Sequence, residues 1–227
     1  MTVANWIFLG LIIIALGLWI ISIIKHKDIL QKTCECLIIP LTATLIIMWL
    51  TKSLPDSFHI IVITAIAFTF ISISAVFLAF EKIRTLRLAG RITSVANILC
   101  WCVLYEPIFR IHAVPAWLWI LCSCVYGAAI ITCCALSGKQ RIVFYLTFAV
   151  SFAVAAFLHF CALIFLCYER TSAAVMLFGG ASLCAGLVAF HFINQAKLNI
   201  KHAGIIRYSL LVASQVLIAC SNILLFQ

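Results

Sequence analysis

The feature that most constrains this chain is a succession of long apolar stretches separated by short polar loops. The eight stretches cover approximately residues 4–24, 34–51, 58–80, 91–105, 115–136, 142–167, 173–193 and 205–225. A helix needs about 20 residues to cross a bilayer. The stretches are continuously apolar, whereas the strands of a membrane β-barrel alternate between apolar and polar residues, so a barrel is disfavoured. We therefore predict an all-α, polytopic membrane helix bundle with about eight transmembrane helices.

The composition excludes a soluble fold. Apolar residues make up 67% of the 227 and charged residues only 9%, against about 25% charged in soluble domains. The loops are short, so we expect residues 1–227 to form a single transmembrane domain. The stretch 4–24 has no preceding positive charge and no small-residue cleavage site before Lys25, which indicates a retained span. The stretch 91–105 is short, and a seven-span chain in which it is re-entrant is the alternative.

Basic residues gather in alternate loops. The loops after the first, third, fifth and seventh stretches hold twelve lysines and arginines, and the other three loops hold three. The positive-inside rule places the first set in the cytoplasm and both termini outside. The net charge of +9 then reflects stop signals and contacts with lipid headgroups. We accordingly expect membrane lipids as partners and no nucleic acid.

The loops also recur at an offset of about half the chain. The loop near 25–32 recurs near 137–141, the loop near 52–57 near 168–171, and the basic stretch 81–91 near 194–207. This pattern predicts two four-helix halves in parallel orientation, residues 1–112 and 113–227, an architecture that recurs in membrane proteins. Residue identity between the halves is slight, so chance similarity of apolar sequence is the alternative.

Twelve cysteines are present, and six of them form C-x-C pairs at 34/36, 100/102 and 122/124. Residues i and i+2 of a helix point about 200° apart, so the two members of such a pair cannot share a metal. No pair has the CxxC spacing of a zinc site. We therefore predict that the cysteines pack as small apolar side chains, and that the chain holds no metal and no cofactor.

Polar side chains inside the spans are rare, and ionisable groups at that depth are functional candidates by default. The set is Glu35, Ser72, Ser74, Asn97, His159, His191 and Gln215. The structural alternative for Glu35 is an interface carboxylate close to Lys32, favoured by the nearby helix N-terminus. For His159 it is a neutral imidazole bonded to a neighbouring helix, and for His191 an interface histidine. Interhelical hydrogen bonds would account for both amides, and bonds to the carbonyl four residues back for both serines.

Several catalytic signatures are missing. The sequence has no GxSxG elbow, no HExxH motif and no Walker loop. No predicted span holds a pair of carboxylates, which argues against proton-relay transporters and intramembrane aspartyl proteases. The last span has no deep lysine, so a retinal Schiff base is unsupported.

A small set of residues between about 30 and 225 nevertheless resembles the sequence pattern of a known membrane-protein family. In the second span, Glu35 precedes Pro40, and in the third span Phe70–Leu78 reads FISISAVFL. The fifth span opens at Val114-Pro115 and continues to Tyr126. The matching skeleton positions are Pro40, Gly90, Pro115, Gly180, Ala181 and Gln215. In these positions the chain resembles the lysoplasmalogenase-like (YhhN-type) membrane family, whose members have eight helices in one small polypeptide.

The resemblance implies hydrolysis of the vinyl-ether bond of lysoplasmalogens, which gives an aldehyde and a glycerophospho-base. Protonating a vinyl ether needs a general acid, and activating water needs a base. The two aspartates of the family pattern fall on Ala75 and Val188, and its lysine falls on Glu35. No aspartate lies elsewhere in the third or seventh span. The resemblance therefore implies a divergent member, either inactive or with a rebuilt site.

In a rebuilt site, the catalytic candidates are Glu35, His191 and Asn97, and the substrate-binding candidates are Gln215 and Ser74. His191 lies three residues past Val188 and shares its helix face. Lysophospholipids would be the substrates, and the bacterial inner membrane is the location that the family implies. A non-catalytic lipid-binding or scaffold protein is the alternative, favoured by the missing aspartates. A small transporter is the third hypothesis, favoured by the repeat and opposed by the scarcity of polar residues along the spans.

Overall fold

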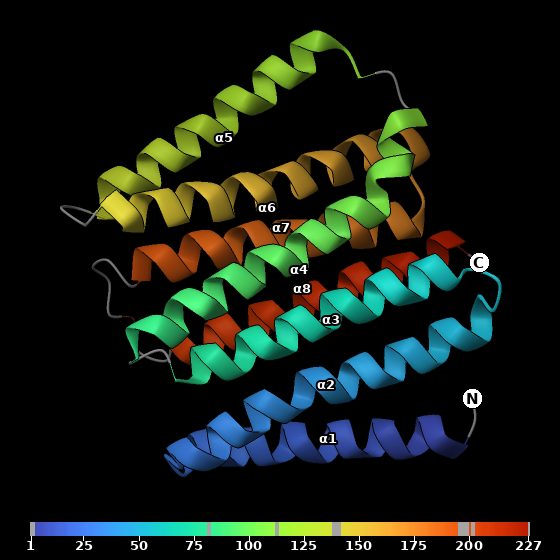
Figure 1. Ribbon diagram of the computed structural model, residues 1–227, viewed down its shortest axis with the longest axis vertical. Helices are drawn as coiled ribbons and strands as arrows, with labels where there is room; N and C mark the ends of the chain where they lie inside the picture. The colour runs from blue at the N-terminus through green and yellow to red at the C-terminus, as the bar shows by residue number, and fades with distance from the viewer. Residues whose placement is uncertain are drawn as a thin grey trace. The chain divides into compact units, whose positions relative to one another are not determined.

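The computed structural model describes residues 3–80, 83–111, 114–137, 142–194, 200 and 203–226. These residues form eight helices and no strand (Figure 1). The helices are α1 (Val3–Ile24), α2 (Asp28–Ser53), α3 (Phe58–Ala79), α4 (Arg84–Ile111), α5 (Ala116–Ser137), α6 (Ile142–Glu169), α7 (Ser172–Ile193) and α8 (Ala203–Phe226). All eight are long and apolar enough to cross a membrane. The predicted all-α membrane bundle of eight helices is confirmed.

Two helices begin six or more residues earlier than their apolar stretches. α2 begins at Asp28 instead of residue 34, and α4 runs from Arg84 to Ile111 instead of over 91–105. Within α4, the segment Thr85–Glu106 is 22 residues long and apolar enough to span a membrane. The bounds predicted for the fourth helix were therefore wrong, and the re-entrant alternative is not supported. Charged residues end an apolar run but not a helix, because Lys, Arg and Gln are good helix formers.

The chain forms two compact units. The first is Met1–Trp101 with Phe226–Gln227, and the second is Cys102–Leu225. The boundary lies inside α4, whereas the sequence pattern placed the division between residues 112 and 113. In the first unit, Leu50, Phe68 and Trp101 are among the large side chains that are fully buried. The fully buried large side chains of the second unit include Tyr105, Leu158 and Leu177.

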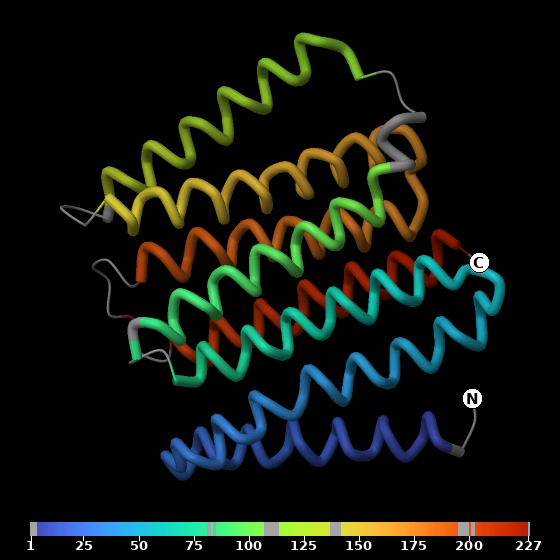
Figure 2. The backbone as a smooth tube through the Cα atoms, viewed as in Figure 1, coloured from blue at the N-terminus to red at the C-terminus, as the bar shows by residue number. Residues whose placement is uncertain are grey.

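The first unit begins with the hairpin of α1 and α2, which lie side by side (Figure 2). The turn between them has His26 at φ 52°. The His26 N–H donates to the Ile23 carbonyl at 3.2 Å, and the Lys27 N–H donates to the Ser22 carbonyl at 2.8 Å. These two bonds form a Schellman motif, whose left-handed position is usually glycine. Because this position is a histidine, the sequence does not indicate that the helix ends here.

Two side chains join α3 to α4 in the first unit. The Ser74 hydroxyl donates to the Gly90 carbonyl at 2.7 Å, and the Asn97 Nδ2 donates to the Ala67 carbonyl at 2.9 Å. Ala67 lies seven residues before Ser74, and Asn97 lies seven residues after Gly90, which is the register of antiparallel helices. A Cβ at Gly90 would lie 2.9 Å from the Leu78 side chain, so a small residue is needed for this approach.

The pair α7 and α8 in the second unit has the same spacing. A Cβ at Gly180 would lie 3.0 Å from the Ser214 carbonyl oxygen. The Ser221 hydroxyl donates to the Ala173 carbonyl at 2.8 Å. Ala173 lies seven residues before Gly180, and Ser221 lies seven residues after Ser214. Each helix pair thus has two contacts of small or hydroxyl residues two turns apart, a spacing that closely packed antiparallel helices share.

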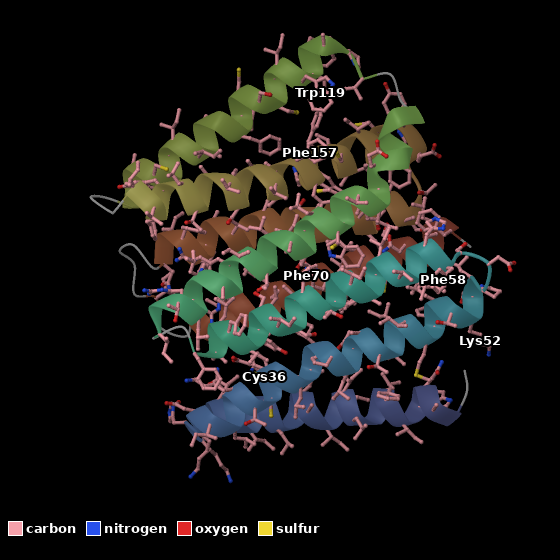
Figure 3. The ribbon with its side chains drawn as sticks, viewed as in Figure 1. Cys36, Lys52, Phe58, Phe70, Trp119 and Phe157 are labelled. Carbon is pink, nitrogen blue, oxygen red and sulfur yellow. The ribbon has the colours of Figure 1, made fainter. Side chains whose placement is uncertain are left out.

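The helix α5 is the least buried of the second unit. It contacts α6 and α7, and it is inclined to α6 (Figure 1). Trp119 on α5 packs edge-on against Phe160 of α6, with ring centroids 4.4 Å apart. Figure 3 shows Trp119 directed from α5 toward α6. Most of the other apolar side chains of α5 are exposed.

Candidate functional site

Glu35 lies on α2, close to the α1–α2 turn, and is half-buried. Its Oε1 accepts a hydrogen bond from Trp19 Nε1 of α1 at 3.2 Å and another from Gln31 Nε2, one turn away on α2, at 2.8 Å. The ammonium group of Lys32 lies over the ring of Phe80, 5.9 Å from its centroid. The carboxylate is therefore fastened to α1, and it is more buried than the exposed interface carboxylate that was the structural alternative.

Asn97 and Ser74 are both fully buried in the α3–α4 contact. The prediction that Asn97 makes an interhelical hydrogen bond is confirmed by its bond to the Ala67 carbonyl. The prediction for the serines holds at Ser72, whose hydroxyl bonds the Phe68 carbonyl four residues back at 2.7 Å. It was wrong at Ser74, whose hydroxyl reaches Gly90 on α4 instead. The close approach of α4 at Gly90 brings a carbonyl within reach of Ser74.

His191 and Gln215 belong to the second unit. His191 lies in the last turn of α7 and is half-buried, with its ring edge-on to Phe192 at 5.8 Å. Gln215 is buried on α8. The site candidates are therefore divided between the two units, with Glu35, Ser74 and Asn97 in the first. Within the first unit, the hydrogen bonds given above for these three residues go to different partners.

The two residues on which the proposed resemblance places the family's aspartates are buried and apolar. Ala75 on α3 is 7% exposed and Val188 on α7 is 9% exposed. Neither side chain can donate or accept a proton. Among the residues that the structure describes, no group of three or more His, Cys, Asp or Glu side chains is arranged to hold a metal ion. All twelve cysteines are free thiols.

A histidine–tyrosine pair lies in the second unit. Tyr126 of α5 and Nδ1 of His159 on α6 form a short hydrogen bond. The His159 ring also lies against Phe178 of α7, with centroids 4.9 Å apart. The prediction that His159 bonds to a neighbouring helix is confirmed. The identity of its partner had no signal in the sequence, because Tyr126 is 33 residues away.

Two further buried polar residues escaped the sequence analysis. The Tyr105 hydroxyl donates to the Ile218 carbonyl of α8 at 3.1 Å. Asn222 on α8 is fully buried, and among the described residues neither atom of its amide group has a hydrogen-bond partner. Tyr105 stood at the predicted end of the fourth span, where a tyrosine reads as an interface residue. Asn222 lies near the end of the last span, where it reads the same way.

No protein-family model, no curated protein and no solved structure matches the chain.

Proposed function

We propose that this chain is a non-catalytic integral membrane protein that binds membrane lipids along its exposed apolar helices. The main observation behind the proposal is that polar side chains at membrane depth make hydrogen bonds that join helices. The Asn97 amide and the Ser74 hydroxyl are bonded to backbone carbonyls of neighbouring helices. Ala75 and Val188, on which the resemblance places the family's acids, are buried and apolar. A divergent member of the lysoplasmalogenase-like family that has lost its chemistry fits this arrangement.

The apolar side chains of two helices support the lipid-binding part of the proposal. On α1 the exposed ones include Trp6, Ile7, Ile13, Ile14 and Ile24. On α5 they are Trp117, Trp119, Ile120, Leu121, Val125, Ile131 and Leu136. Large exposed apolar surfaces mark contacts with membranes or with partner proteins. Aromatic residues near a helix end, such as Trp6 and Trp117, are typical of the headgroup level.

The experiment that tests this proposal is an assay of aldehyde release from a lysoplasmalogen by the purified, folded protein in detergent. We expect no aldehyde from the native chain, and we expect phospholipids to co-purify and to be detected by mass spectrometry. Aldehyde release by the native chain would overturn the non-catalytic assignment. Purified, folded protein without any bound lipid would overturn the lipid-binding assignment.

The second candidate function is hydrolysis of a lysolipid ether with Glu35 as the acid–base group. One observation favours it: two N–H groups hold the Glu35 carboxylate in a fixed position close to the predicted cytoplasmic boundary. In the same assay, this function requires aldehyde from the native chain and none from Glu35→Gln. Glu106→Gln is the matched control, because Glu106 is also a half-buried glutamate within a membrane helix. Equal activity of the two variants would remove Glu35 from the mechanism.

The proposed location is a bacterial cytoplasmic membrane, with the basic loops on the cytoplasmic side. Eight helices of sufficient length and apolarity support a membrane location. The excess of lysine and arginine in alternate loops supports the orientation. Fractionation of the inner and outer membranes of the native host, with detection of this chain in the inner fraction, is the check.

A further inference from the structure

One end of the first unit gathers positive charge from two separate turns. Lys25 and Lys27 lie in the α1–α2 turn, Lys32 in the second turn of α2, and Arg87 and Arg91 in the first two turns of α4. We name these five residues the basic end. The cation–π contact of Lys32 with Phe80, which directly follows α3, brings the two turns together. Figure 3 shows Cys36, one turn beyond Lys32, in the half of α2 nearer the α1–α2 turn, and Lys52 near the other end of α2.

In the described part of the chain, five cations of the basic end stand against two carboxylates. Among the described residues near these turns, the acids are Asp28 and Glu35. Glu35 already accepts hydrogen bonds from Trp19 and Gln31 through Oε1. The positive end of the α4 helix dipole adds positive potential where Arg87 lies. The first turn of α4 has no acidic residue to offset it. An anion is the complementary ligand.

Apolar side chains surround these cations. Ile29 is 85% exposed, Ile24 70%, Ile83 53% and Phe80 52%. In water, such a surface would be unfavourable. At the boundary of a bilayer, the apolar side chains enter the acyl region while lysine and arginine reach outward to the phosphates. This mixture of exposed isoleucine, phenylalanine and cations therefore indicates that the anion is a lipid headgroup at the leaflet surface.

We propose that the basic end binds the headgroup phosphate of an anionic phospholipid, with Lys32 and Arg87 as the principal contacts. The inference rests on the proposed lipid-binding function and gives that function a headgroup preference. Lys32 is exposed and Arg87 is half-buried. They lie on different helices: the Lys32 ammonium is 5.9 Å from the centroid of the Phe80 ring, and the Arg87 N–H donates to the Ile83 carbonyl at 3.0 Å. A phosphate between them would be held from two sides.

The test compares lipid selectivity in phosphatidylcholine bilayers that contain the full chain. Trace spin-labelled phosphatidylglycerol or phosphatidylcholine is added, and the fraction of label immobilised by the protein is measured by electron paramagnetic resonance. The native chain should prefer phosphatidylglycerol several-fold. The double variant K32Q/R87Q should lose most of that preference, because each cation near the surface contributes about fivefold to the binding of an anionic lipid. The preference should also weaken at high salt.

Two control variants make the test specific. K32R/R87K keeps both charges and should keep the preference. A loss in K32Q/R87Q but not in K32R/R87K is then due to the removed charge and not to substitution at these two positions. K52Q removes a lysine at the other end of α2 and should leave the preference unchanged. An unchanged preference in K32Q/R87Q, or an equal loss in K52Q, would overturn the inference.

The inference and the proposed function can fail separately. A native chain that immobilises both lipids equally would overturn the anionic lipid site and leave the lipid-binding function standing. Equal immobilisation is also the result expected if the basic end binds an acidic protein and not a lipid. Aldehyde release from a lysoplasmalogen would overturn the non-catalytic assignment and leave a measured headgroup preference standing.

Discussion

Ser72 and Ser74 lie two residues apart on α3 and use their hydroxyl groups differently. The Ser72 hydroxyl bonds the carbonyl of its own helix, which is already satisfied by the helical hydrogen bond. The Ser74 hydroxyl bonds Gly90 of α4 and is fully buried. Interhelical hydrogen bonds in membrane proteins contribute about 0.6 kcal/mol on average and at most about 1.7 kcal/mol. Ser74→Ala should therefore lower the free energy of unfolding by about 1 kcal/mol.

Ser72→Ala is the matched control, and it should change the free energy of unfolding by less than about 0.5 kcal/mol. Both values are measured by reversible unfolding in mixed micelles with increasing sodium dodecyl sulfate. Equal effects of the two substitutions would mean that the Ser74–Gly90 bond contributes nothing beyond a local hydroxyl bond.

The same residues show what sequence reasoning can and cannot reach at this scale. A buried amide in a membrane helix needs a partner, so an interhelical bond could be predicted for Asn97. The partner could not, because Ala67 is 30 residues away and offers only a carbonyl. For Ser74, the local carbonyl is the default acceptor, and only the approach of Gly90 makes another one available. Glu35 was identified as polar at the membrane boundary, but its tie to Trp19 depends on how α1 packs.

At the scale of helix pairs, α7 and α8 meet at Gly180. A Cβ there would lie 2.7 Å from Ile218 Cγ1 and 3.0 Å from backbone atoms of α8. Backbone cannot give way as a flexible side chain can, so the helices would have to separate. Overpacking of this kind costs about 1–3 kcal/mol, and we expect Gly180→Ala to destabilise the fold by that amount.

The neighbouring glycine provides the control for this prediction. A Cβ at Gly179 would lie 3.7 Å from Leu217 Cδ1, which is an ordinary contact. Gly179→Ala should be neutral or stabilise the helix by up to about 1 kcal/mol, because alanine is the better helix former. Thermal unfolding in detergent distinguishes the two. A Gly180→Ala protein as stable as Gly179→Ala would show that α7 and α8 do not approach closely at this point.

Helix ends were harder to predict than helix cores. The apolar runs located all eight helices because a membrane helix must be apolar over its whole crossing. The runs placed the starts of α2 and α4 six or more residues too late, because these helices continue through charged residues outside the apolar region. The end of α1 carries His26 in a left-handed conformation, where a glycine would have given a clear stop signal.

At the scale of the whole molecule, loop spacing predicted a repeat that residue identity could not support. That repeat stays a prediction, and the boundary between the two compact units falls inside α4 and not between residues 112 and 113. The pairs α3–α4 and α7–α8 each have two close contacts seven residues apart, which involve Gly90 and Asn97 in one and Gly180 and Ser221 in the other. The residue types differ between the pairs, so a sequence comparison does not find them. The common seven-residue spacing is a property of close helix packing, which small and hydroxyl residues both permit.

The orientation of the chain follows from charge and helix count together. Eight spans would place both termini on one side, and twelve basic residues against three predict that this side is outside. In a bacterial host, alkaline phosphatase fused after Gln227 should be active, and a green fluorescent protein fused there should be dark. A fusion after Ser137, where α5 ends, should give the opposite pair of results, because the following loop is predicted to be cytoplasmic. A fusion after Pro55, in the α2–α3 loop, should behave like the fusion at Gln227. Equal results after Ser137 and Gln227 would require an even number of crossings between these two positions, and the three spanning helices α6, α7 and α8 do not allow that. Fluorescence at Gln227 together with none at Ser137 would mean that the orientation is the reverse of the one that the basic loops predict.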